Sequence, residues 1–234
     1  MMMYRFPDPE NAAAPGIVCA TEELDEELLV SAYMQGIFPW YDEARGEPVM
    51  WWCPDPRFVL FPEELHVPKR LRRFLSHTPY TYTMDTAFER VIENCASAAR
   101  PGQYGTWIGS RMREVYAELY RGGIAHSVEV RRGAALVGGF YGVLIGSVFF
   151  GESMFSLESE TAKSAFALFV QAFAACGGRL IDSQVYTSHV ARFGARNISR
   201  AAFLRLERRL LYEPLAHDIA AVFAQTVSGK RYRP

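Results

Sequence analysis

The chain has 234 residues, half of them hydrophobic, which is enough for a sizeable buried core and excludes an intrinsically disordered protein. The formal net charge is only −1, but it is unevenly distributed. Residues 1–66 hold 13 acidic residues against three arginines, whereas residues 67–234 hold 13 acidic residues against 22 bases. This asymmetry predicts a small domain over residues 1–66 and a larger domain over residues 67–234 that can present a basic face to an anion.

Arginine dominates the bases, with 22 arginines against three lysines in the whole chain. A guanidinium group binds phosphate and stacks on bases, so nucleic acid is one candidate partner. A codon bias that favours arginine explains the same composition, and both explanations stay open on composition alone.

Signals for secretion, membrane insertion or metal binding are not evident. The N-terminus shows neither the basic nor the apolar region of a secretory signal. The longest nearly apolar run, residues 136–151, is too short for a membrane span, contains five glycines and is predicted to form a buried β-hairpin. The four cysteines lack a C-x-x-C pair and nearby histidines at zinc-ligand spacing. We therefore expect a cytoplasmic, monomeric protein with no metal, no cofactor and no membrane contact.

The first predicted helix covers residues 25–35, with Thr21 as its N-cap and Gly36 after its end. The following stretch is aromatic and contains four prolines between residues 39 and 56, so no regular helix is expected there. Three of the four tryptophans fall in this stretch. They either form the core of the small domain or line one wall of an apolar pocket.

A second helix is predicted to begin at Pro68, with Leu71, Phe74 and Leu75 facing the core. Four bases project from it: Lys69, Arg70, Arg72 and Arg73. Such a cluster can hold the phosphates of a nucleic acid, although charged helix faces are most often simply solvated.

The rest of the chain alternates between strand-like and helix-like patterns. The predicted elements are a strand from residue 81, helices over 85–99 and 110–121, a β-meander over 125–150, a helix over 160–176, a strand over 179–185 and a helix over 199–210. Strands before and after helices, around a central meander, indicate an α/β or α+β fold.

The strand predicted over residues 179–185 carries the strongest candidate site. Alternate side chains of a strand share a face, so Asp182 and Gln184 are expected side by side. A carboxylate in an apolar run is costly unless it is used or paired. Asp182 is therefore either catalytic, part of a hydrogen-bonded turn, or the ion-pair partner of a nearby arginine such as Arg192 or Arg196.

A second carboxylate, Glu152, follows the buried run at residues 148–150. It is either functional or the cap of the next helix. The sequence has no G-x-S-x-G elbow, H-E-x-x-H motif or Walker lysine. His126 and Ser127 are neighbours on a predicted strand, so they face opposite ways and do not form a catalytic dyad.

Six segments carry a resemblance to a known family. They are YMQGIFPW at residues 33–40, WWCPDPR at 51–57, TWI at 106–108, HSVE at 126–129, GESMFS at 151–156 and LIDSQ at 180–184. In this order they resemble the leucyl/phenylalanyl-tRNA-protein transferase family, and the match extends from residue 20 to residue 205. The sequence departs from the family pattern around Thr161, which leaves details of the donor site open.

The resemblance implies a small N-terminal α/β domain followed by an acyl-CoA N-acyltransferase-like (GNAT-like) domain. It also implies an enzyme that moves Leu, Phe or Met from aminoacyl-tRNA to the α-amine of an N-terminal Arg or Lys of a protein, which marks that protein for degradation in the N-degron pathway. Asp182 and Gln184 would be the catalytic pair, and Glu152 would help to hold the donor or the acceptor. Further residues would line the pocket for the aminoacyl side chain: Trp51 or Trp52, Trp107, Phe149 and Phe173.

The reaction implied is aminolysis of an ester, in which the enzyme orients two substrates and handles one proton. Asp182, acting through Gln184, is predicted to draw on the attacking amine, and the bases at residues 69–73 are predicted to contact the tRNA backbone. One alternative is a CoA-dependent N-acetyltransferase, but residues 150–160 lack the glycine-rich turn that holds a pyrophosphate. The other is a non-catalytic module that binds tRNA or peptide, which leaves Asp182 unexplained.

Overall fold

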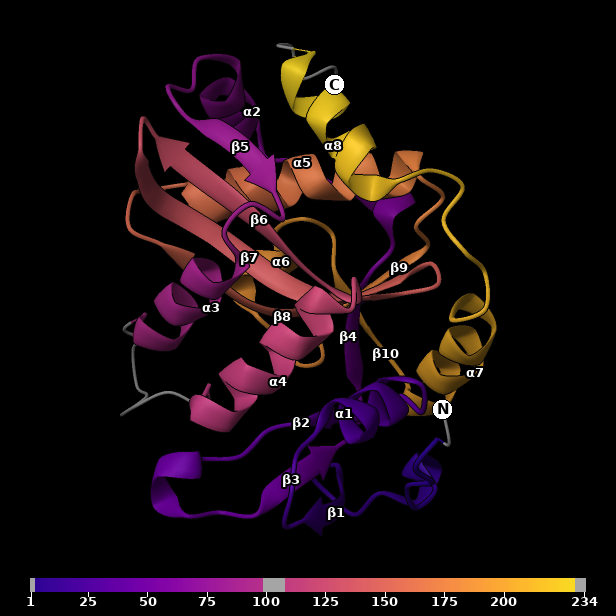
Figure 1. Cartoon of the computed structure of the whole chain (residues 1–234). Coiled ribbons are helices and arrows are strands. Elements are labelled where there is room, and N and C mark those ends of the chain that lie inside the picture. The colour runs from indigo at the N-terminus through magenta and orange to yellow at the C-terminus, as the bar shows by residue number, and fades with distance from the viewer. Residues whose placement is uncertain (1–2, 99–107, 230–234) are drawn as a thin grey trace.

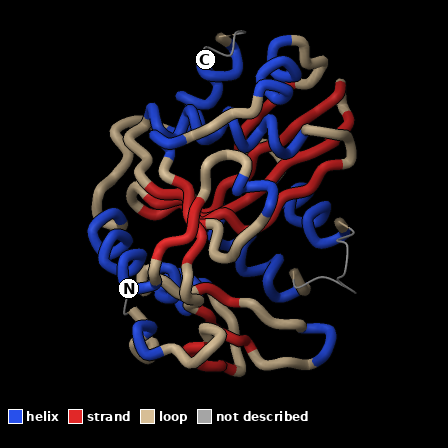
Figure 2. Tube along the Cα trace, turned by 180° about the vertical axis from the view of Figure 1, so that it is seen from behind, coloured by secondary structure: helices blue, strands red, loops and turns tan. Residues whose placement is uncertain are grey.

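The computed structural model describes residues 3–98 and 108–229, and two sheets organise them (Figure 1). The small sheet has the order β1-β3-β2 and is antiparallel. Its strands are β1 (Ile17–Thr21), β2 (Phe38–Pro39) and β3 (Val49–Trp52). The view from behind shows this sheet at the lower end of the molecule, apart from the large sheet (Figure 2).

The large sheet has the order β10-β4-β9-β8-β7-β6-β5. Its strands are β4 (Arg57–Leu60), β5 (Thr81–Met84), β6 (Ala125–Arg132), β7 (Ala135–Ile145), β8 (Val148–Ser156), β9 (Leu180–Asp182) and β10 (Arg196–Ile198). Neighbouring strands are antiparallel except β8 and β9, which run parallel. The predicted meander and the β-hairpin of residues 136–151 are confirmed by β6, β7 and β8.

Helices cover both faces of the large sheet (Figure 1). The α-helices of the described residues are α1 (Glu26–Tyr33), α2 (Lys69–Ser76), α3 (Phe88–Ser97), α4 (Ser110–Arg121), α5 (Thr161–Ala175), α6 (Ser188–Ala191), α7 (Arg200–Leu210) and α8 (Ile219–Ser228). Alternate residues of β7 divide between two cores, because Tyr141 packs with α3 and α4 while Phe140 packs with α5. The expected α+β fold, with a small N-terminal sheet before the large one, is confirmed.

The change from the small to the large sheet occurs between Trp52 and Arg57. Residues 57–60, which the charge pattern assigns to the small domain, therefore lie in the large sheet. Trp51 of β3 and Phe150 of β8 belong to the same hydrophobic cluster, so the two sheets share one core. Among the described residues, none of the helices combines the length and apolar character that crossing a membrane requires.

Two local predictions need correction. The first helix is capped by Asp25, whose Oδ1 accepts from the N–H of Leu28 at 2.7 Å, because Thr21 is already the last residue of β1. The strand predicted over residues 179–185 ends at Asp182. Gln184 has a φ of 63°, in the left-handed region that no strand residue adopts.

Candidate active site

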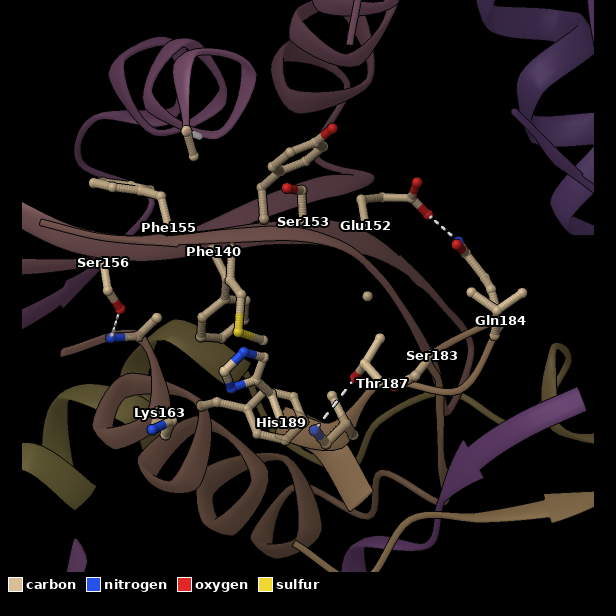
Figure 3. Close-up of a pocket in the computed structure, with 18 of the residues that line it drawn as sticks. Phe140, Glu152, Ser153, Phe155, Ser156, Lys163, Ser183, Gln184, Thr187 and His189 are labelled. Atoms are coloured by element: carbon tan, nitrogen blue, oxygen red, sulfur yellow. Dashed lines mark hydrogen bonds between the residues drawn. The ribbon is translucent and has the colours of Figure 1, made fainter. Parts of the chain in front are cut away.

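A cavity of about 740 Å³ opens where β8 and β9 separate. Residues 148–150 of β8 pair with residues 180–182 of β9, and beyond these three pairs the strands diverge. Aromatic and aliphatic side chains form most of the wall, including those of Trp40, Phe140, Phe149, Phe155, Phe166 and Val190. Glu152 and Gln184 meet at one end of the cavity, and Lys163 and His189 lie on the side next to α5 (Figure 3).

A β-bulge aims Glu152 into this site. Tyr141 of β7 pairs with Ser153, and the next residue, Gly142, pairs with Gly151, so Glu152 is the extra residue of β8. The bulge requires glycine opposite it, because a Cβ at position 142 would lie 2.2 Å from the carbonyl oxygen of Phe150.

Glu152 is held by three hydrogen-bond donors from different elements. Its Oε1 accepts from the hydroxyl of Tyr33 at 2.7 Å and from Nε2 of Gln184 at 2.8 Å. Its Oε2 accepts from the hydroxyl of Tyr116 at 2.9 Å. Burial raises the pKa of Glu152 to about 7, and the hydrogen bonds from the two tyrosines oppose that rise. Glu152 is therefore able to exchange a proton near neutral pH.

Asp182 and Gln184 do not share a strand face. The carboxylate of Asp182 is fully buried, and its Oδ1 accepts from the backbone N–H of Gln184 at 2.9 Å. The side chain of Gln184 instead lines the cavity. The expectation that strand alternation places both side chains together is wrong, because the chain turns directly after Asp182.

The ion-pair partner of Asp182 is Arg57, not Arg192 or Arg196. Arg57 donates from Nε to Oδ1 at 2.8 Å and from Nη2 to Oδ2 at 2.5 Å, and both side chains are fully buried. Arg196 pairs with Glu64 on the surface. The sequence did carry a signal for this missed residue, since Arg57 directly precedes the apolar run at residues 58–60.

The aromatic residues proposed for the pocket divide between wall and core. Phe149 lines the cavity, whereas Phe173 is buried behind it and stacks on Phe169. Trp51 is fully buried in the core shared by the two sheets. Trp107 lies outside the described residues.

Among the described tryptophans, Trp40 lines the cavity. It belongs to the three tryptophans for which the sequence left a core or a pocket wall open, but the family resemblance did not name it for the pocket. Its side chain is 38% exposed and packs on Trp52, with ring centroids 5.7 Å apart. Nε1 of Trp52 donates to the backbone carbonyl of Trp40 at 2.7 Å. Trp52 therefore supports the cavity wall and does not belong to it.

The four bases of α2 remain available to a ligand. Lys69, Arg70 and Arg73 are exposed and Arg72 is half-buried. Within residues 3–98 and 108–229, no carboxylate forms an ion pair with any of them. The helix predicted to begin at Pro68 begins one residue later, with Pro68 as its N-cap. Leu71 is buried as predicted, whereas Phe74 and Leu75 are half-buried.

The segment at residues 126–129 has a structural role. Glu129 is fully buried and accepts from the hydroxyls of Ser127, Thr83 and Thr86 at 2.6 to 2.7 Å. His126 lies 2.7 Å from Asp85 through Nδ1. In the part of the chain that the structure describes, no group of three or more His, Cys, Asp or Glu side chains could hold a metal ion.

Comparison with known proteins places this architecture in a family. The model of the leucyl/phenylalanyl-tRNA protein transferase matches residues 59–208, and the model of its N-terminal domain matches residues 22–55. A leucyl/phenylalanyl-tRNA–protein transferase of Oleidesulfovibrio alaskensis is 48% identical over 215 residues, which are 90% of this chain and 86% of that protein. One from an Anaeromyxobacter species is 50% identical over 220 residues, 92% of this chain and 93% of that protein.

Among solved structures, L-PGS from Bacillus licheniformis superposes with a TM-score of 0.42 and 11% identity, over 67% of this chain and 64% of that chain. The two family matches lie on either side of the change from the small to the large sheet, between residues 55 and 59. Together they include Tyr33, Glu152, Asp182 and Gln184. The chain belongs to the leucyl/phenylalanyl-tRNA–protein transferase family.

Proposed function

We propose that this protein transfers Leu, Phe or Met from aminoacyl-tRNA to the α-amine of an N-terminal Arg or Lys of a protein in the cytoplasm. The modified protein is thereby marked for degradation. The observation that carries the proposal is the pair of Glu152 and Gln184 at one end of a largely aromatic cavity, in a chain of this family.

The cavity suits the aminoacyl side chain of the donor. Phe140, Phe149 and Phe166 give the cavity an apolar wall between its polar end at Glu152 and Lys163 on α5. A hydrophobic slot distinguishes side chains by size and shape, at about 1 to 3 kcal/mol for each methylene. We therefore expect selection for large apolar side chains, with limited discrimination among Leu, Phe and Met.

The polar end of the cavity suits the proton transfer. The acceptor amine, with an unperturbed pKa of about 8, must lose its proton before its nitrogen attacks the ester carbonyl. Glu152, whose pKa burial raises to about 7, is matched to accept that proton. The new bond is the amide C–N bond and the broken bond is the ester C–O bond. The acceptor nitrogen, protonated at first, loses two protons: one goes to Glu152 and the second goes to the ribose oxygen as it leaves.

Gln184 is proposed to orient the amine. Its Nε2 is engaged by Glu152, which leaves the amide oxygen to accept a hydrogen bond from the incoming amine. Asp182 touches neither the cavity nor a substrate that occupies it, so its part in the proposed catalytic pair is to hold the backbone of Gln184.

The tRNA is proposed to bind through α2. Lys69, Arg70, Arg72 and Arg73 lie on the helix that packs against α5, and α5 contributes Lys163 to the cavity. Contacts of this kind go to the phosphate backbone and are independent of sequence.

Acetyl-CoA is a poorer donor for this site. A pyrophosphate needs free N–H groups at a helix N-terminus. The link between β8 and α5 instead carries Glu158 and Glu160, and Oγ of Ser156 already accepts from the N–H of Ala162.

One assay separates the candidate functions. The protein is incubated with leucyl-tRNA, acetyl-CoA and a peptide that begins with Arg, and the peptide is then weighed by mass spectrometry. The proposal expects one added leucine, and little addition with the Glu152→Gln variant. An added acetyl group would support the N-acetyltransferase, and an unmodified peptide would support a non-catalytic binding module.

A further inference from the structure

One buried guanidinium group, that of Arg57, connects two of the three donors that hold Glu152. Arg57 lies on β4 and is fully buried. Its Nε and Nη2 donate to Asp182, and its Nη1 donates to the backbone carbonyl of Gly36 at 3.1 Å. Burial alone would lower the pKa of Arg57, but Asp182 beside it raises that pKa, so the group stays charged.

The hydrogen bonds from Arg57 to Asp182 begin a first chain of contacts, which leads to Gln184. The oxygen of Asp182 that accepts from Nε of Arg57, Oδ1, also accepts from the backbone N–H of Gln184 at 2.9 Å. This contact holds Gln184 at a φ of 63°, which non-glycine residues seldom adopt. In that conformation Nε2 of Gln184 reaches Oε1 of Glu152 at 2.8 Å.

The hydrogen bond from Arg57 to Gly36 begins a second chain of contacts, which leads to Tyr33. Gly36 follows the end of α1, and its backbone N–H donates to the carbonyl of Tyr33 at 3.3 Å. Gly36 has a φ of 75°, and a Cβ there would lie 2.4 Å from Cδ2 of Leu204, so the turn is tightly enclosed. By holding this turn, Nη1 of Arg57 fixes the end of α1, from which Tyr33 donates to Oε1 of Glu152 at 2.7 Å.

Two rings fix the plane of the guanidinium. Its central carbon lies 4.8 Å from the ring centroid of Phe38 and 4.3 Å from that of Phe203. A planar fork held in this way can serve two acceptors at fixed angles, which the single ammonium of lysine cannot do.

We propose that Arg57 is a positioning residue of the transfer reaction: through Asp182 and Gly36 it holds Gln184 and Tyr33 where both donate to the same oxygen of Glu152. The inference rests on the proposed function, in which Glu152 accepts the proton of the acceptor amine. Arg57 itself touches neither substrate, since it does not line the cavity.

The inference has a measurable consequence, because hydrogen bonds from Tyr33 and Gln184 favour the charged form of Glu152. The other titratable groups around this network are Tyr116 on α4, Tyr141 on β7, Asp182 on β9, Glu207 on α7 and Cys53. None of them changes in the Arg57→Lys variant, which also keeps the positive charge. Loss of these two chains of contacts should therefore raise the pKa of Glu152.

The test is the pH dependence of kcat/KM for leucyl transfer to a peptide that begins with Arg. We expect the limb of the pH profile that reports the ionisation of Glu152 to move to higher pH by about one unit in Arg57→Lys. The reason is that loss of one charge-assisted hydrogen bond to a carboxylate raises its pKa by about that amount. The acceptor amine titrates in the same way in all variants, so it does not contribute to the difference. A folded Arg57→Lys variant that loses rate without any shift of the limb would overturn the inference.

Two further variants keep the test decisive. Phe203→Leu removes one ring but keeps the guanidinium, and a smaller shift in the same direction is expected; an unmoved limb in this folded variant would overturn the inference even where Arg57→Lys does not fold. Arg200→Lys is the matched control, because Arg200 binds the backbone carbonyls of Cys53, Ala12 and Glu10 and not the site, so no shift is expected. Failure of the proposed function would look different, because the wild-type pH profile would then contain no limb that disappears in the Glu152→Gln variant.

Discussion

Glu152 and Gln184 face each other across the opening between β8 and β9, with Nε2 of Gln184 2.8 Å from Oε1 of Glu152. A bulge in β8 supplies the first residue, and a left-handed turn after β9 supplies the second. Two backbone irregularities on neighbouring strands thus create the polar end of an otherwise apolar cavity.

Removal of the Gln184 side chain should affect the chemical step more than binding. In Gln184→Ala we expect kcat to fall by about 10²-fold, since the variant cannot make the orienting hydrogen bond to the attacking amine. Single-turnover rates of leucyl transfer measure this. Gln225→Ala is the control, because Gln225 is an exposed residue of α8 that does not line the cavity. Equal decreases in the two variants would contradict the assignment.

The rate should depend on the protonation of Glu152. A carboxyl group with a pKa of about 7 is protonated below that pH and cannot accept a proton, so transfer should rise as the pH increases through 7. Glu152→Gln should lower the rate by about 10²-fold or more and remove this limb. The limb near pH 8 that belongs to the acceptor amine should remain. A Glu152→Gln profile that keeps the limb at pH 7 would assign it to another group.

Donor preference should follow the cavity wall. Phe166 lines the cavity, and replacing it with the smaller leucine gives the donor side chain more room. We expect Phe166→Leu to shift the ratio of phenylalanyl to leucyl transfer in favour of phenylalanyl by about 10-fold, from competition between the two donors. Phe173→Leu is the matched control, since Phe173 is buried behind the wall. A similar shift in both variants would mean that the change in donor preference comes from repacking of the core and not from the cavity wall.

The affinity for tRNA should fall when the basic side chains of α2 are removed. Replacing Lys69, Arg70, Arg72 and Arg73 by Ala should reduce the slope of log K against log salt by about 0.7 to 0.9 for each phosphate that the protein no longer neutralises. Binding titrations at several salt concentrations provide the slope. Arg113→Ala with Arg121→Ala is the control on α4, which covers the opposite face of the sheet. An undiminished slope in the α2 variant would place the tRNA-binding surface elsewhere.

A second buried carboxyl group, that of Glu207 on α7, should make stability pH-dependent. It is fully buried, and within the described residues neither of its oxygens has a hydrogen-bond partner. Burial raises its pKa well above the usual range. The folded protein therefore keeps the proton that the unfolded chain releases above pH ~4.3, and stability from this group is lost as the pH rises through the folded pKa.

Glu207→Gln removes this titration. The free energy of unfolding of the variant relative to wild type should therefore increase from pH 5 to pH 8, as measured by urea unfolding. Glu213→Gln, at an exposed position beside Arg209, is the control and should show little pH dependence. A constant difference between wild type and Glu207→Gln would show that Glu207 is ionised in the folded protein.

Local patterns determined much of this protein. The helix predicted over residues 110–121 has those bounds in the structure, because apolar spacing and Gly109 and Gly122 at its ends define it without tertiary help. The basic helix after Pro68 is equally local. Asp182 and Glu152 were identified as candidates because a carboxylate within or at the end of an apolar strand is costly unless it is used or paired.

Only the tertiary structure decided how these residues meet. Arg57 lies 125 positions before Asp182, and Tyr33 lies 119 positions before Glu152, so no spacing in the sequence could pair them. Their contacts depend on which strands become neighbours, and β4 joins the large sheet beside β9 although the three strands before it in the sequence form the small one. The bulge at Glu152 and the turn at Gln184 likewise arise from register and hydrogen bonding across strands, whereas strand alternation alone describes a regular strand and therefore misplaced Gln184.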